Sequence, residues 1–186
     1  MEALEIIQLL VYIGAFLSLI LISANDNANS IIPNGLSLGF GALAFVHYLI
    51  NVNSKNWWLP LVVVVGTFLA LFLLFCITGE SLVGGGDMKI LLASLLMLNS
   101  GALYEKYIIS VCCFTLLGAL IALVKREKRV RCGVYYALSI LTVILPLEPL
   151  NLAVVLLIFL VAVSLVEFFV YDKERCFYEV QAFKEI

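Results

Sequence analysis

The chain has 186 residues, of which 64% are hydrophobic and only 13% are charged. A soluble domain is about half apolar and a quarter charged, so this composition excludes an ordinary water-soluble protein and predicts a polytopic protein of the lipid bilayer. The formal net charge of −2, without any cluster of basic and aromatic residues, excludes nucleic acid as a partner.

Apolar stretches predict an all-α bundle of six or seven transmembrane helices, forming a single domain over residues 1–186. We interpret the first stretch as a retained helix rather than a signal peptide, because no basic residue precedes Lys55. The fourth and sixth stretches are short for a full crossing. The stretches run at about 4–23, 35–51, 57–78, 88–99, 104–124, 133–146 and 150–171.

The basic residues predict which way the bundle faces. If seven spans alternate across the membrane, nine of the eleven lysines and arginines fall on one side, which the positive-inside rule places in the cytoplasm. Asp26 and Asp87 then both lie at cytoplasmic helix ends. The nine are Lys89, Lys125, Arg126, Lys128, Arg129, Arg131, Lys173, Arg175 and Lys184.

Residues that commonly bind metals or cofactors are sparse. None of the five cysteines belongs to a C-x-x-C pair, which argues against a zinc or redox motif. The single histidine, His47, lies toward the outer end of the second stretch, and we interpret it as a packing residue. We therefore expect no metal and no cofactor.

The first motif follows the first apolar stretch. Asp26 is followed seven residues later by Pro33 and then by Asn34. Taken alone, segment 26–34 is typical of a polar interfacial loop, with asparagine and aspartate favouring turns and Pro33 starting the next helix.

The second motif precedes the fourth apolar stretch and consists of Gly84, Gly85, Gly86, Asp87 and, two residues later, Lys89. A simple interpretation is a glycine linker followed by an aspartate that caps a helix. Ordering three glycines nevertheless costs more backbone entropy on folding than ordering other residues, and a simple linker would not require this cost. A functional interpretation is that they allow the close approach of another backbone or direct Asp87 toward a partner.

Together the two aspartates fit aspartic proteolysis. This chemistry needs two carboxylates close enough that one stays protonated while the other is ionised. The ionised carboxylate takes a proton from water, and the protonated one polarises the scissile carbonyl. Ionisable residues at membrane depth are candidates for function by default.

The two motifs resemble those of the type IV prepilin and preflagellin peptidases. That family has an aspartate seven residues before the proline of Ile-Pro-Asn, and later a Gly-x-Gly-Asp-x-Lys; the resemblance covers roughly residues 5–145. It implies that Asp26 and Asp87 are the catalytic pair of an aspartic endopeptidase in the inner (cytoplasmic) membrane. Its implied partner is a pilin-like precursor, whose basic leader is cleaved next to a hydrophobic helix. Residues implied to shape the site or its loops are Gly84, Gly85, Gly86, Lys89, Pro33 and Asn34.

The sequence departs from that family pattern in three places. No basic residue stands between Asp26 and Ile32, so we expect an altered leader preference with an unchanged catalytic pair. The Val-Pro-Tyr-Gly of short members has only its valine and glycine here, at Val130 and Gly133, which leaves the role of this segment open. We expect no cysteine-rich N-terminal domain, for which these 186 residues leave no space, and therefore cleavage without methyl transfer.

Three alternatives remain open. An intramembrane protease of the presenilin and signal peptide peptidase type also uses Gly-x-Gly-Asp, but it carries a Tyr-Asp in mid-span and a later Pro-Ala-Leu, and this sequence has neither. A small cation-coupled transporter using both aspartates predicts further polar residues inside the helices. An assembly factor without chemistry predicts that both aspartates can be replaced.

Overall fold

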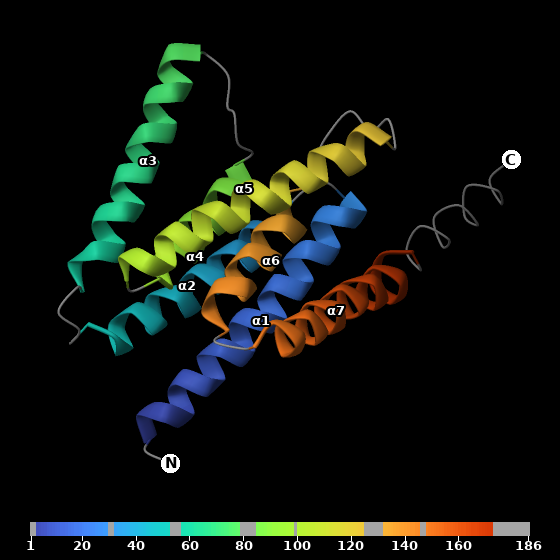
Figure 1. The fold of residues 1–186 in the computed structure, drawn as a ribbon, viewed down its shortest axis with the longest axis horizontal. Helices are drawn as coiled ribbons and strands as arrows, with labels where there is room; N and C mark the ends of the chain where they lie inside the picture. The colour runs from blue at the N-terminus through green and yellow to red at the C-terminus, as the bar shows by residue number, and fades with distance from the viewer. Residues whose placement is uncertain are drawn as a thin grey trace, which may run out of the picture.

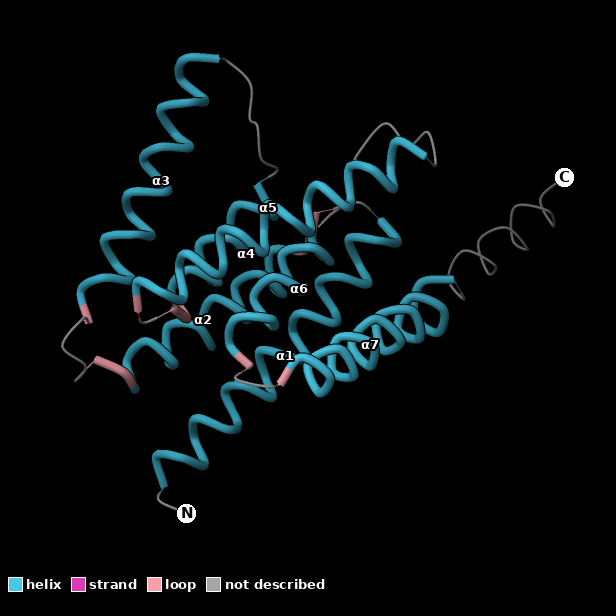
Figure 2. The backbone as a smooth tube through the Cα atoms, in the orientation of Figure 1, coloured by secondary structure: helices cyan, strands magenta, loops and turns pink. Residues whose placement is uncertain are grey.

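The computed structural model describes residues 3–29, 32–52, 57–78, 85–98, 100–124, 132–145 and 148–172. These residues form seven α-helices without a strand among them, which confirms the all-α prediction (Figures 1 and 2). The helices are α1 (Ala3–Asn29), α2 (Asn34–Ile50), α3 (Trp58–Thr78), α4 (Gly85–Leu96), α5 (Gly101–Val124), α6 (Gly133–Ile144) and α7 (Pro149–Val166), followed by a π-helical segment, η1 (Glu167–Asp172).

Four of the helices are long and apolar enough to cross a membrane. The candidate spans are Ala3–Asn29, Trp58–Ile77, Gly101–Ile121 and Pro149–Val170. Helices α4 and α6 have 12 residues each, as expected from their short apolar stretches. At a rise of about 1.5 Å per residue, such a helix covers little more than half of the roughly 30 Å hydrocarbon layer.

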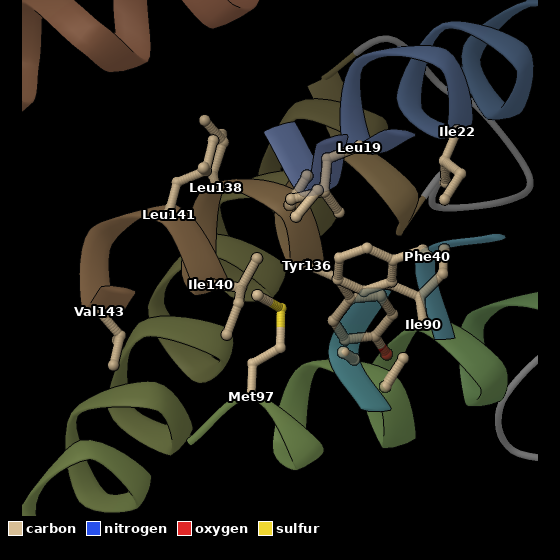
Figure 3. Close-up of a cluster of buried hydrophobic side chains, with 14 of the residues drawn as sticks. Leu19, Ile22, Phe40, Ile90, Met97, Tyr136, Leu138, Ile140, Leu141 and Val143 are labelled. Carbon is tan, nitrogen blue, oxygen red and sulfur yellow. The ribbon is translucent and has the colours of Figure 1, made fainter. Parts of the chain in front are cut away.

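The core is built around α6, which contacts α1, α4, α5 and α7 and lies in the middle of the bundle (Figure 1). Nine of its twelve residues are buried. Figure 3 shows Ile140 next to Met97, which directly follows α4, and Tyr136 next to Phe40 of α2, so side chains from separate parts of the chain fill this centre. The short helix is apolar because protein surrounds it.

Helix α3 shows the opposite environment. It packs against α4 and stands away from the rest of the bundle (Figure 1). Only 6% of its candidate span is buried in the protein, although the helix is almost wholly apolar. Such an exposed apolar surface matches a lipid environment, where a helix satisfies its backbone hydrogen bonds internally.

One predicted boundary differs from the structure. The sequence predicts a first helix over 4–23 followed by a polar loop, but α1 continues to Asn29. The side-chain amide of Asn29 donates a hydrogen bond of 2.7 Å to Oδ1 of Asn25, one turn earlier. Ala24 and Ala28 are buried in the same segment, so packing and this hydrogen bond extend the helix through polar residues that are typical of a turn.

Candidate active site

Asp26 lies in the last turn of α1 and is buried, with 6% of its surface exposed. The backbone N–H of Gly133 donates a hydrogen bond of 2.8 Å to its Oδ2 atom. Gly133 is the first residue of α6, where backbone N–H groups have no partner within their own helix. The carboxylate of one helix therefore uses a free donor of another, 107 residues away in sequence.

Asp87 lies in the first turn of α4, which begins at Gly85. The aspartate is half-buried, and its Oδ1 atom is buried without a hydrogen-bond partner among the described residues. Gly85 and Gly86 are the first helical residues rather than a linker, and Gly84 lies outside the described residues. A buried carboxylate oxygen without a partner is costly, and sites that bind or react are where such atoms are expected.

Gly86 lies against the first motif. A Cβ atom added to it would be 2.7 Å from Cβ of Ile32, closer than real Cβ atoms approach. Ile32 directly precedes Pro33, whose extended backbone (φ −61°, ψ 137°) forms the N-cap of α2. The absence of a side chain at Gly86 therefore lets the start of α4 approach the segment that joins α1 to α2.

A second contact joins the same two motifs. The Lys89 ammonium donates a hydrogen bond to Oδ1 of Asn34, the first residue of α2. Lys89 is exposed and follows Asp87 by two residues on α4. Pro33, Asn34, Gly86 and Lys89 thus form one junction between α2 and α4, and this junction holds the helix that carries Asp87.

The electrostatics bring the two aspartates into one site. Burial, and then the negative charge of Asp26, raises the pKa of Asp87 from its ordinary value of 3.8 to about 6. Burial and the charges of Asp87 and Asp26 likewise raise the pKa of the Cys132 thiol to about 11. Three acidic groups from α1, α4 and the residue before α6 therefore lie within electrostatic range of one another.

Sequence reasoning did not assign the residues around the start of α6. The sequence alone assigns no role to segment 130–133. In the structure Gly133 binds Asp26 directly, and the charges of both aspartates raise the pKa of Cys132. Two signals were available: a glycine at the start of a short apolar stretch, and the match of Val130 and Gly133 to the valine and glycine of the family's Val-Pro-Tyr-Gly. Val130 lies outside the described residues.

His47 lies apart from this junction, near the other end of α2 from Asn34. The two residues are 13 positions apart on the helix, or about 20 Å along its axis. His47 is 4% exposed, and its ring centroid lies 5.3 Å from that of Tyr12. Among the described residues, no group of three or more histidine, cysteine, aspartate or glutamate side chains is arranged to hold a metal ion.

Of the residues behind the predicted orientation, only Lys89 and Lys106 lie in the described part of the chain. Lys89 is at the same end of the bundle as Asp87, whereas Lys106 is in the second turn of α5, which begins at Gly101. The basic segment 125–131 and the basic residues after 172 lie outside the described residues.

Comparison with known proteins identifies the family. The sequence model of the type IV leader peptidase family matches residues 13–124, a segment that contains both aspartates and the junction of α2 with α4 but ends before Gly133. No curated protein and no solved structure matches the chain. The matched segment covers more than half of the sequence, and the chain belongs to the type IV leader peptidase family of membrane peptidases.

Proposed function

We propose that this protein is an aspartic endopeptidase that uses Asp26 and Asp87 to remove the leader peptide of type IV pilin-like precursors. The observation that carries the proposal is that Asp87, on α4, lies near enough to Asp26, on α1, for the charge of Asp26 to raise its pKa further, beyond the larger effect of burial. Two carboxylates that share a site cannot both ionise easily, so one proton is held by the pair over a pH range in which isolated carboxyls are ionised.

The reaction needs one ionised and one protonated carboxylate. The ionised member takes a proton from a water molecule, whose oxygen forms a bond to the scissile carbonyl carbon. The protonated member gives its proton to the carbonyl oxygen, which receives the π electrons of the C=O bond. When the tetrahedral intermediate collapses, the C–N bond breaks and the leaving amine takes the proton that the first carboxylate had accepted. One hydroxyl of the intermediate gives its proton to the second carboxylate, which restores the pair.

The place of the pair in the fold supports a substrate at the membrane boundary. Asp26 ends a long apolar helix that qualifies as a span, and Asp87 begins a short one. A peptide bond cleaved there lies just outside the hydrocarbon layer, where a basic leader meets the hydrophobic helix of a pilin-like precursor. We place this boundary at the cytoplasmic face of the inner membrane, on the basic residue bias.

The experiment that tests the proposal is co-expression with a pilin-like precursor that has a basic leader and a hydrophobic N-terminal helix. Leader removal is scored as a mobility shift on a gel and by sequencing of the new N-terminus. We expect cleavage by the wild-type protein and none by Asp26→Asn or Asp87→Asn at equal membrane levels. Normal processing by purified Asp87→Asn would exclude the aspartic mechanism and favour a transporter or an assembly factor.

A further inference from the structure

Gly133 contacts Asp26 directly, and it lies outside the segment that matches the family. Two independent features of the structure connect them. The Gly133 N–H binds Oδ2 of Asp26, and the space that a side chain at residue 133 would need is filled by Asp26 itself.

The packing at Gly133 leaves no room for a methyl group. An added Cβ atom would lie 2.9 Å from Oδ2, 3.1 Å from Cβ and 3.2 Å from Cγ of Asp26. Neither partner can easily move away, because Asp26 is buried at the end of α1 and α6 is enclosed by four helices. An alanine at residue 133 would therefore displace the carboxylate rather than a flexible side-chain end.

The start of α6 also acts on the charge of Asp26. A hydrogen bond from a backbone N–H to a carboxylate stabilises the ionised form, and the N-terminus of a helix adds a partial positive charge. Asp87 has a different environment, since its buried Oδ1 lacks a hydrogen-bond partner among the described residues. The structure thus contains an asymmetry between the two aspartates that their sequence motifs do not reveal.

We propose that Gly133 is a positioning residue of this peptidase: its amide holds the Asp26 carboxylate in place and ionised, so that Asp26 is the general base and Asp87 the general acid. The assignment rests on the proposed function. Asp26 takes the proton of the attacking water, the water oxygen bonds to the carbonyl carbon, and Asp87 gives its proton to the carbonyl oxygen. Among the described residues, the acidic groups that act electrostatically on this pair are Cys132, just before α6, and Tyr136 of α6.

The test compares Gly133→Ala with Gly101→Ala in purified protein in detergent. Gly101 is a matched control because it is also the first residue of a helix, α5, and a Cβ atom there would meet nothing within 4 Å. Each variant is assayed for leader cleavage of a pilin-like precursor across pH, with kcat and KM measured separately.

We expect Gly133→Ala to lower kcat by about 10- to 100-fold with little change in KM, because displacement of a reacting group by about 1 Å has effects of this size. The acid limb of its pH profile should move to higher pH, since a carboxylate with a weakened hydrogen bond is protonated more readily. Gly101→Ala should behave as wild type. A wild-type kcat and pH profile for Gly133→Ala, or a loss confined to KM, would overturn the proposal.

A thermal unfolding cycle tests the contact without any substrate. We expect Gly133→Ala to lower the unfolding temperature in the wild-type background and to cost clearly less in an Asp26→Ala background, where the crowded carboxylate is absent. Because this comparison measures unfolding rather than cleavage, it also tests the contact if the Gly133→Ala protein folds too poorly to be assayed for activity. Equal costs in the two backgrounds would overturn the proposal. Absence of cleavage by the wild-type protein would instead reject the peptidase function, whereas unequal costs would still establish the contact.

Discussion

Asp26 and Asp87 reach the same site from opposite kinds of helix end, and their surroundings differ accordingly. Asp26 is nearly fully buried at the end of a 27-residue helix, with Oδ2 bound by the Gly133 amide. Asp87 is half-buried at the start of a 12-residue helix, with Oδ1 lacking a partner among the described residues. The comparison teaches that a hydrogen bond from the protein backbone holds one carboxylate, whereas the other has a buried oxygen that no described residue binds.

The largest expected effect comes from removing either carboxyl group. Asp26→Asn or Asp87→Asn keeps the side-chain shape, and each should lower leader cleavage by about 10³-fold or more, because residues that act as one unit fail together. The double variant should be no worse than either single one. The measurement is kcat/KM on a pilin-like precursor with purified enzyme.

Glu105→Gln is the matched control for these variants. It makes the same acid-to-amide change on an exposed residue of α5, and it should leave cleavage unchanged. Additive losses in the double variant would show that Asp26 and Asp87 act separately, which contradicts their comparison as two members of one pair.

The next largest loss of activity is expected from a change at the start of α4, the helix that carries Asp87. Gly86→Ala places a Cβ atom where Ile32 already lies, so α4 must shift and Asp87 with it. We expect kcat/KM to fall by about 10- to 100-fold, as for other displacements of a reacting group. Gly39→Ala on α2, where an added Cβ meets nothing within 4 Å, is the control and should retain activity. Full activity of Gly86→Ala would show that the close approach of α4 to Ile32 is dispensable.

A smaller effect on activity is expected at the hydrogen bond between Lys89 and Asn34, which joins α4 to α2 near Asp87. Lys89→Met or Asn34→Ala removes one partner of the hydrogen bond between α4 and α2. Because Lys89 is exposed, each change should lower kcat/KM only about 2- to 10-fold, and the double variant should match the worse single one. Lys106→Met, a change of another exposed lysine, serves as the control. Independent losses would indicate that Lys89 and Asn34 act through other contacts.

Asp87 should also make stability depend on pH. Its pKa is raised from 3.8 to about 6, so the folded state binds this proton more tightly than the unfolded state does. The resulting stabilisation is complete below about pH 4 and is lost as the pH rises through 6. Asp87→Asn has no group that titrates here, so its stability does not fall with pH for this reason. The difference in unfolding temperature, variant minus wild type, should therefore be larger at pH 8 than at pH 4. Thermal scans in detergent measure the difference, and an equal difference at both pH values would contradict the raised pKa.

The fold was accessible from the sequence because long apolar runs specify helices almost by themselves in a bilayer. Asp26 and Asp87 could be proposed as a catalytic pair because their two motifs resemble those of the family and because aspartic proteolysis needs two carboxylates. Their catalytic role stays a prediction. The predicted end of α1 was wrong. Asn25 and Asn29 are typical of turns, and the hydrogen bond between their side chains within the helix is visible only in the structure. The bond of Gly133 to Asp26 links residues 107 positions apart, and no local pattern encodes such a contact.

The smallest expected effect on kcat is that of replacing His47. This change tests whether the catalytic site is limited to the two aspartates and the residues that hold them. The residue is 4% exposed, packs near Tyr12 and receives a hydrogen-bond contact of 3.4 Å from the Asn51 side chain. It lies near the opposite end of α2 from the junction that holds Asp87, so no proton passes between them directly. His47→Ala should therefore leave kcat per folded molecule within about twofold of wild type, while the cavity it creates lowers the unfolding temperature. A large loss of kcat in protein that is still folded would mean that proton transfer extends across the bundle, as a proton-coupled transporter requires, and the two aspartates would then no longer form a self-contained pair.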